Sequence, residues 1–217
     1  ILDMNVNKVM VLFVEGYTDL LVLSTIIENR RSYKEITNYD LSNKFKKLDD
    51  IWNPLAGKLP KHEKKSLTNN SNIILMLSGG GKPTIYKKLT YLIEDLNRNS
   101  RIFRRIPLND VFLIIDSDNA EINQIITNNI ITRLQGNRYT QNLLQQAAHC
   151  IRNNHYATVT LQAVTIHIIA ISPSLNHILD NSNINQKQLD RQSILSNTQF
   201  IDTLLRNSCI NDLLQSI

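Results

Sequence analysis

Short apolar runs that alternate with helical patterns make up the hydrophobic pattern of the chain. Residues 9–14, 73–77 and 111–115 form continuous, β-branched runs of the kind found in buried parallel strands, and residues 164–171 form a fourth. Each run ends in a polar or glycine-containing turn. Apolar residues then recur at helical spacing, which predicts one helix after each strand.

The segments outside this alternation complete the expected architecture. Residues 32–72 are rich in Lys, Asn and Asp and interrupt the pattern, so we expect a partly helical insertion there. Residues from 185 onward predict one or two amphipathic helices. The expected fold is an α/β, Rossmann-like domain over residues 1–181, with a mostly parallel four-stranded sheet flanked by helices. A C-terminal helical extension is expected over residues 182–217.

The composition and the apolar pattern indicate where in the cell we expect the protein. The 217 residues are 42% hydrophobic and 20% charged, which is ordinary for a globular protein. No apolar run approaches the roughly 18 residues of a membrane-spanning helix, and the first residues lack the features of a secretory signal. The two cysteines, Cys150 and Cys209, have no partners at metal-binding spacing. These features predict a cytoplasmic protein with no membrane partner.

Positive charge is concentrated in the first half of the chain. Residues 1–110 hold 18 Lys and Arg against 12 Asp and Glu, a net charge of +6, whereas residues 111–217 hold 6 against 7, a net charge of −1. A basic half favours an anionic partner such as DNA or RNA, although the same excess also serves solubility.

The expected insertion combines basic and aromatic residues. Such a segment can lie along a phosphate backbone and stack a base. The alternative is a solvated loop that is anchored by Trp52. The candidate nucleic-acid-binding residues are Lys44, Lys46, Lys47, Lys58, Lys61, Lys64 and Lys65.

Acidic residues follow the first predicted strand directly. Glu15 lies at the end of the run, at the rim of the expected sheet, and Gly16 lets the backbone turn sharply and a phosphate approach closely. Asp19 falls in the first turn of the next helix, where a negative charge suits the helix dipole. The group is a candidate for metal and phosphate binding, although Asp in a first turn is also a common capping residue.

The second predicted strand ends in Gly79-Gly80-Gly81-Lys82. Successive glycines leave backbone N–H groups that can face an anion, and Lys82 adds a positive charge. The spacing differs from that of a P-loop, because Pro83 follows the lysine where a P-loop has Ser or Thr. We expect this turn to contact phosphate, and the alternative is a flexible connection.

Two carboxylates follow the third predicted strand. Asp116 and Asp118 are one residue apart, so both can leave the strand on the same side and share a hard cation. The alternative is structural, with Asp118 as the N-cap of the next helix and Asp116 merely exposed. Because the carboxyl ends of parallel strands meet at one edge of a sheet, we expect Glu15, the glycine turn and the two aspartates to converge.

The motifs gain specificity from their order. Strand–Glu–Gly–x–x–Asp, strand–glycine turn and strand–Asp–x–Asp together resemble the Toprim family, which includes topoisomerases, primases and OLD-type nucleases. The resemblance covers residues 8–121 and extends more loosely to residue 180. Its second motif is most similar to that of OLD-type nucleases, which implies a catalytic role for Lys82 at the phosphate.

The resemblance also implies roles for the acidic residues. Glu15 would be the general acid or base, Asp116 and Asp118 would hold Mg²⁺ or Mn²⁺, and Asp19 would support the first site. Nuclease-type relatives often carry a further acid after the fourth strand. Here only Asp180 is near, which argues against a second metal site and against efficient cleavage.

These features predict a metal-dependent Toprim nuclease, or a related phosphotransferase, that processes DNA or RNA. The C-terminal helices are a candidate homodimer contact. One alternative is a non-catalytic nucleic-acid-binding or assembly module, in which the basic insertion carries the function. Another is a primase-like Toprim piece of a larger replication protein. A receiver-like phosphoryl-transfer domain fits badly, because the glutamate comes first and the paired aspartates third.

Overall fold

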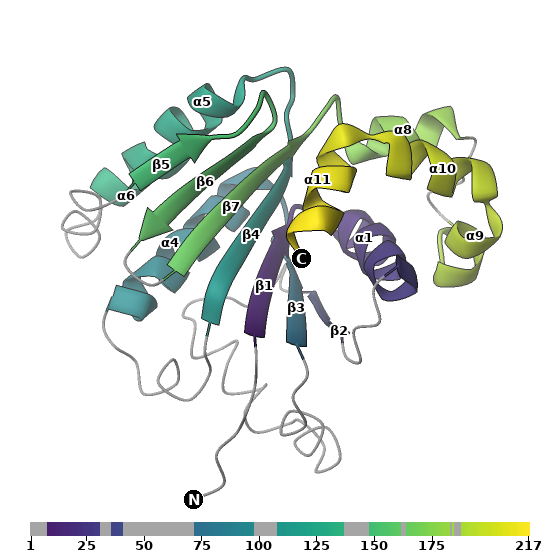
Figure 1. The fold of residues 1–217 in the computed structure, drawn as a ribbon, viewed down its shortest axis with the longest axis horizontal. Coiled ribbons are helices and arrows are strands. Elements are labelled where there is room, and N and C mark those ends of the chain that lie inside the picture. The colour runs from purple at the N-terminus through teal and green to yellow at the C-terminus, as the bar shows by residue number, and fades with distance from the viewer. Residues whose placement is uncertain are drawn as a thin grey trace, which may run out of the picture.

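A mixed β-sheet forms the centre of the computed structural model, which describes residues 8–30, 36–40, 72–97, 108–136, 148–161, 164–182, 184 and 188–217 (Figure 1). The described strands are β1 (Lys8–Val14), β2 (Ile36–Asp40), β3 (Asn72–Ser78), β4 (Leu108–Asp116), β5 (Ala148–Ile151), β6 (Tyr156–Leu161) and β7 (Val164–Ile171). Their order across the sheet is β2-β3-β1-β4-β7-β6-β5. The first five in this order are parallel, β6 is antiparallel to β7, and β5 is antiparallel to β6. The expected α/β class with a mostly parallel sheet is confirmed.

The expected strand number was wrong, because seven strands are present among the described residues instead of four. The four expected strands are β1, β3, β4 and β7. Strand β2 lies inside the segment expected to be an insertion and pairs with β3. Strands β5 and β6 form a hairpin beside β7. The basic candidates of the insertion lie outside the described residues: Lys44, Lys46, Lys47, Lys58, Lys61, Lys64 and Lys65.

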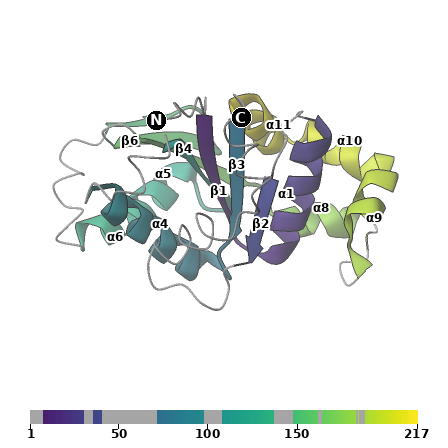
Figure 2. The same ribbon diagram turned by 90° about the horizontal axis from the view of Figure 1, so that it is seen from below.

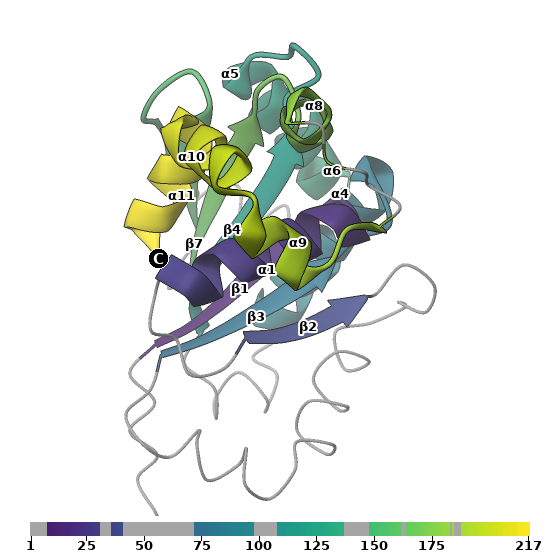
Figure 3. The ribbon, with the colours of Figure 1, turned by 90° about the vertical axis from the view of Figure 1, so that its right-hand side faces the viewer.

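Helices cover both faces of the sheet, as Figures 2 and 3 show. One face carries α1 (Tyr17–Arg30), α8 (Leu175–Asn181), α9 (Arg191–Ser196), α10 (Thr198–Arg206) and α11 (Ser208–Ser216). The other face carries α4 (Lys82–Asn97), α5 (Ile122–Gln124), a π-helical segment (Ile125–Ile131) and α6 (Thr132–Gln135). Among the described ranges, no helix has the length and apolar character needed to cross a bilayer.

The central position of β1 explains its uninterrupted apolar sequence. Val11 and Phe13 join the core beneath α4, while Met10, Leu12 and Val14 join the core beneath α1. All five side chains are buried. Successive strand residues point to opposite faces, so a strand covered on both sides needs apolar residues at every position.

The described residues 188–217 include three helices, not the one or two that were expected. Side-chain caps divide this region: Asp190 accepts from Ser193 N at 2.7 Å and Asn197 from Phe200 N at 2.9 Å. Asn207 likewise begins α11. Such residues satisfy the free N–H groups of a helix start, so each one favours a new helix. Their apolar residues belong to the same core as α1.

The connections after the central strands lead to opposite faces of the sheet. The chain leaves β1 toward the face of α1, whereas it leaves β3 and β4, the two neighbours of β1, toward the face of α4 (Figure 2). Open α/β sheets bind ligands outside the carboxyl ends of the strands at such a reversal. The residues that follow β1, β3 and β4 are therefore candidates for a binding site.

Candidate functional site

Glu15 follows the last residue of β1 and reaches the end of β4. Its Oε1 accepts a hydrogen bond from the backbone N–H of Asp116 at 2.8 Å. Burial raises the pKa of Glu15 to about 7, although the Asp116 N–H and the Lys82 ammonium act in the opposite direction. A carboxyl group with this pKa is partly protonated near neutral pH, so it can both accept and donate a proton.

Asp116 ends β4 and lies beside Glu15. Its Oδ1 accepts a hydrogen bond from the backbone N–H of Leu175, at the start of α8, at 3.0 Å. Burial raises the pKa of Asp116, while the Leu175 N–H and the Lys82 ammonium oppose the shift. The aspartate is therefore a fixed part of the sheet edge rather than a freely exposed side chain.

Asp118 lies on a tight turn that presents its side chain to solvent. Asp118 and Asn119 both adopt left-handed backbone conformations, with φ of 47° and 64°. Asp and Asn tolerate this region better than most residues. The turn is closed by a hydrogen bond from Ala120 N to Ser117 O at 2.8 Å. The alternative role of Asp118 as a helix N-cap is wrong, because Glu121 occupies that position.

Lys82 joins the acids that follow two different strands. It is the first residue of α4, and its ammonium forms an ion pair with Asp118 and lies 3.7 Å from Glu15 Oε1. The Asp118 side chain is 70% exposed, so the ion pair lies at the surface of the cluster. The expected convergence of Glu15, Lys82, Asp116 and Asp118 at one sheet edge is thus present.

The glycine turn holds the end of β1 in place. Gly79 N donates to Val14 O at 2.8 Å, and Gly81 N donates to Glu15 O at 2.9 Å. The expectation that these two N–H groups face an anion is wrong in this conformation, because both are used within the protein. A Cβ on Gly79 would lie 2.8 Å from Ile85 Cβ, so glycine also allows α4 to pack closely.

Gly16 and Asp19 form a second local brace. Gly16 N donates to Asp19 Oδ2 at 2.8 Å, so the expected phosphate contact of this N–H is also absent in this conformation. Burial raises the pKa of Asp19 to about 6, the Gly16 N–H lowers it, and nearby Asp116 raises it further. Asp19 therefore fixes the turn that carries Glu15.

Three residues near the site were not among those predicted from the sequence. Lys88 is buried, and its ammonium donates to Gly79 O at 3.2 Å. Tyr86 is also buried, and burial with the negative charges of Glu15 and Asp118 raises its pKa to about 12, although Arg133 opposes the shift. The Arg133 guanidinium lies 5.6 Å from the Tyr86 ring centre. The four-residue spacing of Lys82 and Tyr86 could have revealed the tyrosine, because such residues share a helix face.

The site has the donor chemistry of a hard divalent cation but not a closed metal cage. Among the described residues, no group of three or more His, Cys, Asp and Glu side chains is arranged to hold a metal ion. Mg²⁺ often needs only one or two protein carboxylates, together with water and substrate phosphates. Glu15, Asp116 and Asp118 supply such oxygens, and the Lys82 ammonium shows that a cation is accommodated between Glu15 and Asp118.

The cluster can carry out two kinds of chemistry. Glu15 can exchange a proton, and the exposed Asp118–Lys82 pair can meet a charged ligand. Comparisons of the chain with protein-family models, with curated proteins and with solved structures found no match. The similarity of the motifs to the Toprim family stays a prediction.

Proposed function

We propose that the chain processes phosphodiester bonds of DNA or RNA at a Toprim-type site that uses Mg²⁺ or Mn²⁺. The observation that carries this proposal is the hydrogen bond from Asp116 N to Glu15 Oε1, which joins the acids at the ends of β1 and β4. These residues are 101 positions apart in the chain. The strand-end position at a reversal of the connections is where α/β folds bind their ligands.

Each residue of the cluster has a role in the proposed reaction. Glu15 transfers the proton of the attacking or leaving oxygen, because its pKa of about 7 suits this task near neutral pH. Lys82, once drawn away from Asp118, pairs with the phosphate oxygens. Asp116 and Asp118 would hold the divalent ion, and Glu15 would be a further oxygen donor. The bound ion supplies positive charge that stabilises the transition state of the phosphate.

The electrostatics of the cluster support cation binding. Glu15, Asp19 and Asp116 have raised pKa values, mainly through burial. A nearby divalent cation favours the ionised form of such groups. Lys82 supplies only part of the positive charge that would stabilise the ionised acids. A bound divalent cation would therefore stabilise them further.

A second candidate function is nucleic-acid binding without catalysis. The net charge of +6 on residues 1–110 favours it, because a basic segment attracts an anionic partner. In that case the Lys82–Asp118 pair would be a structural contact of the turn.

Cleavage assays with site variants separate the two candidates. We expect the full chain to cleave plasmid, linear duplex, single-stranded DNA or RNA in Mg²⁺ or Mn²⁺, and EDTA to abolish the activity. Glu15→Gln and Asp118→Asn should each lower the rate by about 100-fold or more. Asp202→Asn, an exposed acid on α10, is the matched control and should retain full activity.

Two outcomes would contradict the catalytic proposal. Undiminished cleavage by a folded Asp118→Asn protein would remove the assignment of Asp118. Binding of nucleic acid in EDTA, with no cleavage in either metal, would favour the non-catalytic alternative. Circular dichroism and thermal melting of each variant would verify that the fold is retained.

A further inference from the structure

A hollow of about 540 Å³ lies next to the turn that carries Asp118. Its walls come from the turn after β4, the β5–β6 turn, the end of β7 and the start of α11. Ser117 and Asn119, the chain neighbours of Asp118 on either side, both line it. Since adjacent Cα atoms are about 3.8 Å apart, the backbone of Asp118 lies close to the hollow.

The lining of the hollow is suited to a neutral ligand rather than to a phosphate. Among the described residues no Lys or Arg lines it, Glu121 adds an acidic group, and amide groups are frequent, including those of Asn119, Asn123 and Asn154. An amide both donates and accepts hydrogen bonds, as the edge of a nucleobase requires. Ile151, which is 44% exposed, adds an apolar surface against which a flat ring can pack. The volume is typical of small-molecule sites.

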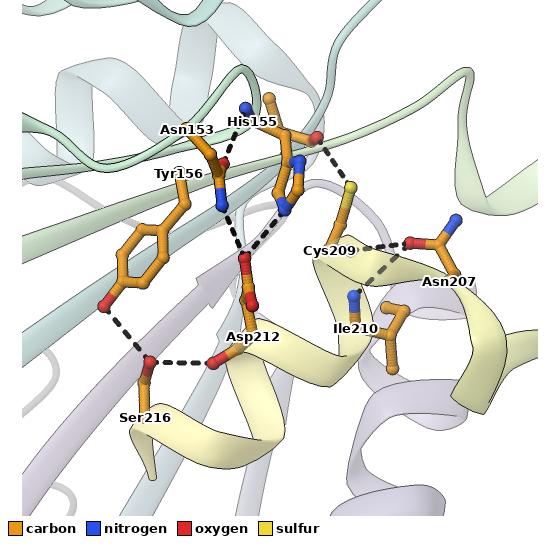
Figure 4. Close-up of polar contacts among 9 residues, drawn as sticks. Asn153, His155, Tyr156, Asn207, Cys209, Ile210, Asp212 and Ser216 are labelled. Carbon is orange, nitrogen blue, oxygen red and sulfur yellow. Dashed lines mark hydrogen bonds and ion pairs between the residues drawn. The ribbon is translucent and has the colours of Figure 1, made fainter.

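The β5–β6 wall of the hollow is held in place by α11. Asp212 Oδ2 accepts from Asn153 Nδ2 at 2.8 Å and lies 2.8 Å from His155 Nε2. Asn153 Oδ1 in turn accepts from His155 N at 3.0 Å. Figure 4 shows these groups converging between the hairpin and the helix. A wall fixed in this way loses little conformational entropy when a ligand binds.

The opposite wall is also held by hydrogen bonds. Ser117 N donates to Ile171 O at 2.8 Å, which ties the turn after β4 to the end of β7. Ser117 Oγ accepts from Asn119 N at 3.4 Å. Asn119 therefore lies in the wall of the hollow and directly follows Asp118, which pairs with Lys82.

We infer that this hollow binds the base and sugar of the nucleotide whose phosphate lies at the carboxylate cluster. The inference rests on the proposed function, because it places the phosphate beside Asp118 and Lys82. It adds a subsite that selects nucleotides over other phosphate esters. Lys82 and a divalent ion at the cluster would meet the phosphate charge, and the amides of the hollow would contact the nucleoside.

Binding measurements in Mg²⁺ test the subsite without requiring catalysis, because a mononucleotide has no internucleotide phosphodiester bond to cleave. Isothermal titration calorimetry of the full chain would compare the four ribonucleoside 5′-monophosphates, the four deoxyribonucleoside 5′-monophosphates and ribose 5-phosphate. We expect at least one nucleotide to bind about tenfold more tightly than ribose 5-phosphate, which has the phosphate and sugar but no base.

Paired variants locate the binding. The double variant Asn123→Ala/Asn154→Ala removes two exposed amides from the hollow and should weaken nucleotide binding about tenfold, with ribose 5-phosphate unaffected. The matched control is Asn128→Ala/Asn211→Ala, which removes exposed amides that do not line the hollow. It should bind nucleotides as the unmodified chain does.

The outcomes distinguish this inference from the proposed function. Equal affinity for nucleotides and ribose 5-phosphate, no nucleotide binding, or full binding by Asn123→Ala/Asn154→Ala would each overturn the subsite. Nucleotide binding that depends on these two amides, without metal-dependent cleavage, would support the subsite and remove the enzyme. Metal-dependent cleavage without nucleoside selectivity would support the proposed function and overturn the subsite.

Discussion

At the scale of single residues, burial makes ionisation unfavourable for three acids at the sheet edge. Burial is the largest cause of the raised pKa values of Glu15, Asp19 and Asp116. Ionisation of such groups is unfavourable unless a cation or a hydrogen-bond donor compensates. Backbone N–H groups and Lys82 compensate in part. Clusters of this kind occur more often at functional sites than elsewhere, because their chemistry needs shifted pKa values.

Asp19→Asn should stabilise the protein at high pH. The folded pKa of Asp19, about 6, lies above its ordinary value of 3.8. Its stability contribution is therefore complete below pH 3.8 and is lost as the pH rises through 6. Asparagine can still accept the Gly16 hydrogen bond but carries no charge. We expect a gain of roughly 2 kcal/mol at pH 8 and almost none near pH 4, from urea unfolding in EDTA.

The control for this prediction is Asp202→Asn, which changes an exposed acid on α10. It should leave the free energy of unfolding nearly unchanged at both pH values. A loss of stability by Asp19→Asn at pH 8 would show that the Gly16 bond requires a carboxylate.

The acids of the site were predictable from the sequence, but their surroundings were not. Glu15, Asp116 and Asp118 each stand at or just beyond the end of a β-branched run, and the geometry of parallel sheets brings such positions together. The direction of the Gly79 and Gly81 N–H groups depends on the approach of β1, which is a tertiary contact. A local sequence pattern does not predict a contact between segments that are far apart in the chain.

At the scale of elements, the β5–β6 hairpin and α11 stabilise one another. Besides the Asp212 contacts, Tyr156 OH lies 2.7 Å from His167 Nδ1 and 3.1 Å from Ser216 Oγ on α11. His167 Nε2 lies 2.8 Å from Asp110 Oδ1 (β4). One hydrogen-bonded chain thus connects β4, β7, β6 and α11. Buried polar groups joined in this way fix the packing of one element on another.

The hairpin was missed because its signals are short. Strand β5 has four residues and includes His149 and Cys150, so it offers no apolar run. Strand β6 does show alternation, with Ala157 and Val159 facing the core, and Asn153 in the preceding turn is typical of a hairpin connection. Strands that are covered on both faces give the stronger pattern, which is why β1, β3, β4 and β7 were found.

Asp212→Ala should loosen α11 from the hairpin. The change removes the acceptor of both Asn153 and His155, so we expect a loss of about 1–2 kcal/mol in the free energy of unfolding at pH 7. Hydrogen exchange should become faster at the β5–β6 turn and in α11 but not in α4. Asp202→Ala is the matched control on α10, and equal exchange in both variants would contradict the proposed anchoring.

At the scale of the whole molecule, the site is an outcome of connectivity. Chain connections leave β1 toward one face and its neighbours β3 and β4 toward the other, so three loops meet at the reversal. The hydrogen bonds from the glycine turn to Val14 and Glu15 then couple the β3 loop to the β1 loop. Lys82, carried by α4, couples both to the loop after β4. A ligand at this point would contact loops that lie more than 100 positions apart in the chain, from Glu15 to Asp118.

Divalent-ion binding should therefore be linked to both protonation and global stability. At pH 7, a Glu15 carboxyl with a pKa of about 7 is about half protonated, and a bound cation favours its ionised form. We expect Mg²⁺ or Mn²⁺ to release protons at pH 7 and to bind more tightly as the pH rises from 6 to 8. Above that range Glu15 is already ionised, so the affinity should level off.

Calorimetric titration in two buffers of different ionisation enthalpy measures this proton release directly. Glu15→Gln should remove most of it at pH 7, while Asp202→Asn should retain it. Since a ligand that binds only the folded state stabilises that state, the metal at ten times its Kd should add about 1.4 kcal/mol to the free energy of unfolding. Identical metal affinity at pH 6 and pH 8 would show that Glu15 does not contact the ion, and the proposed role of Asp116 and Asp118 would then have to stand without it.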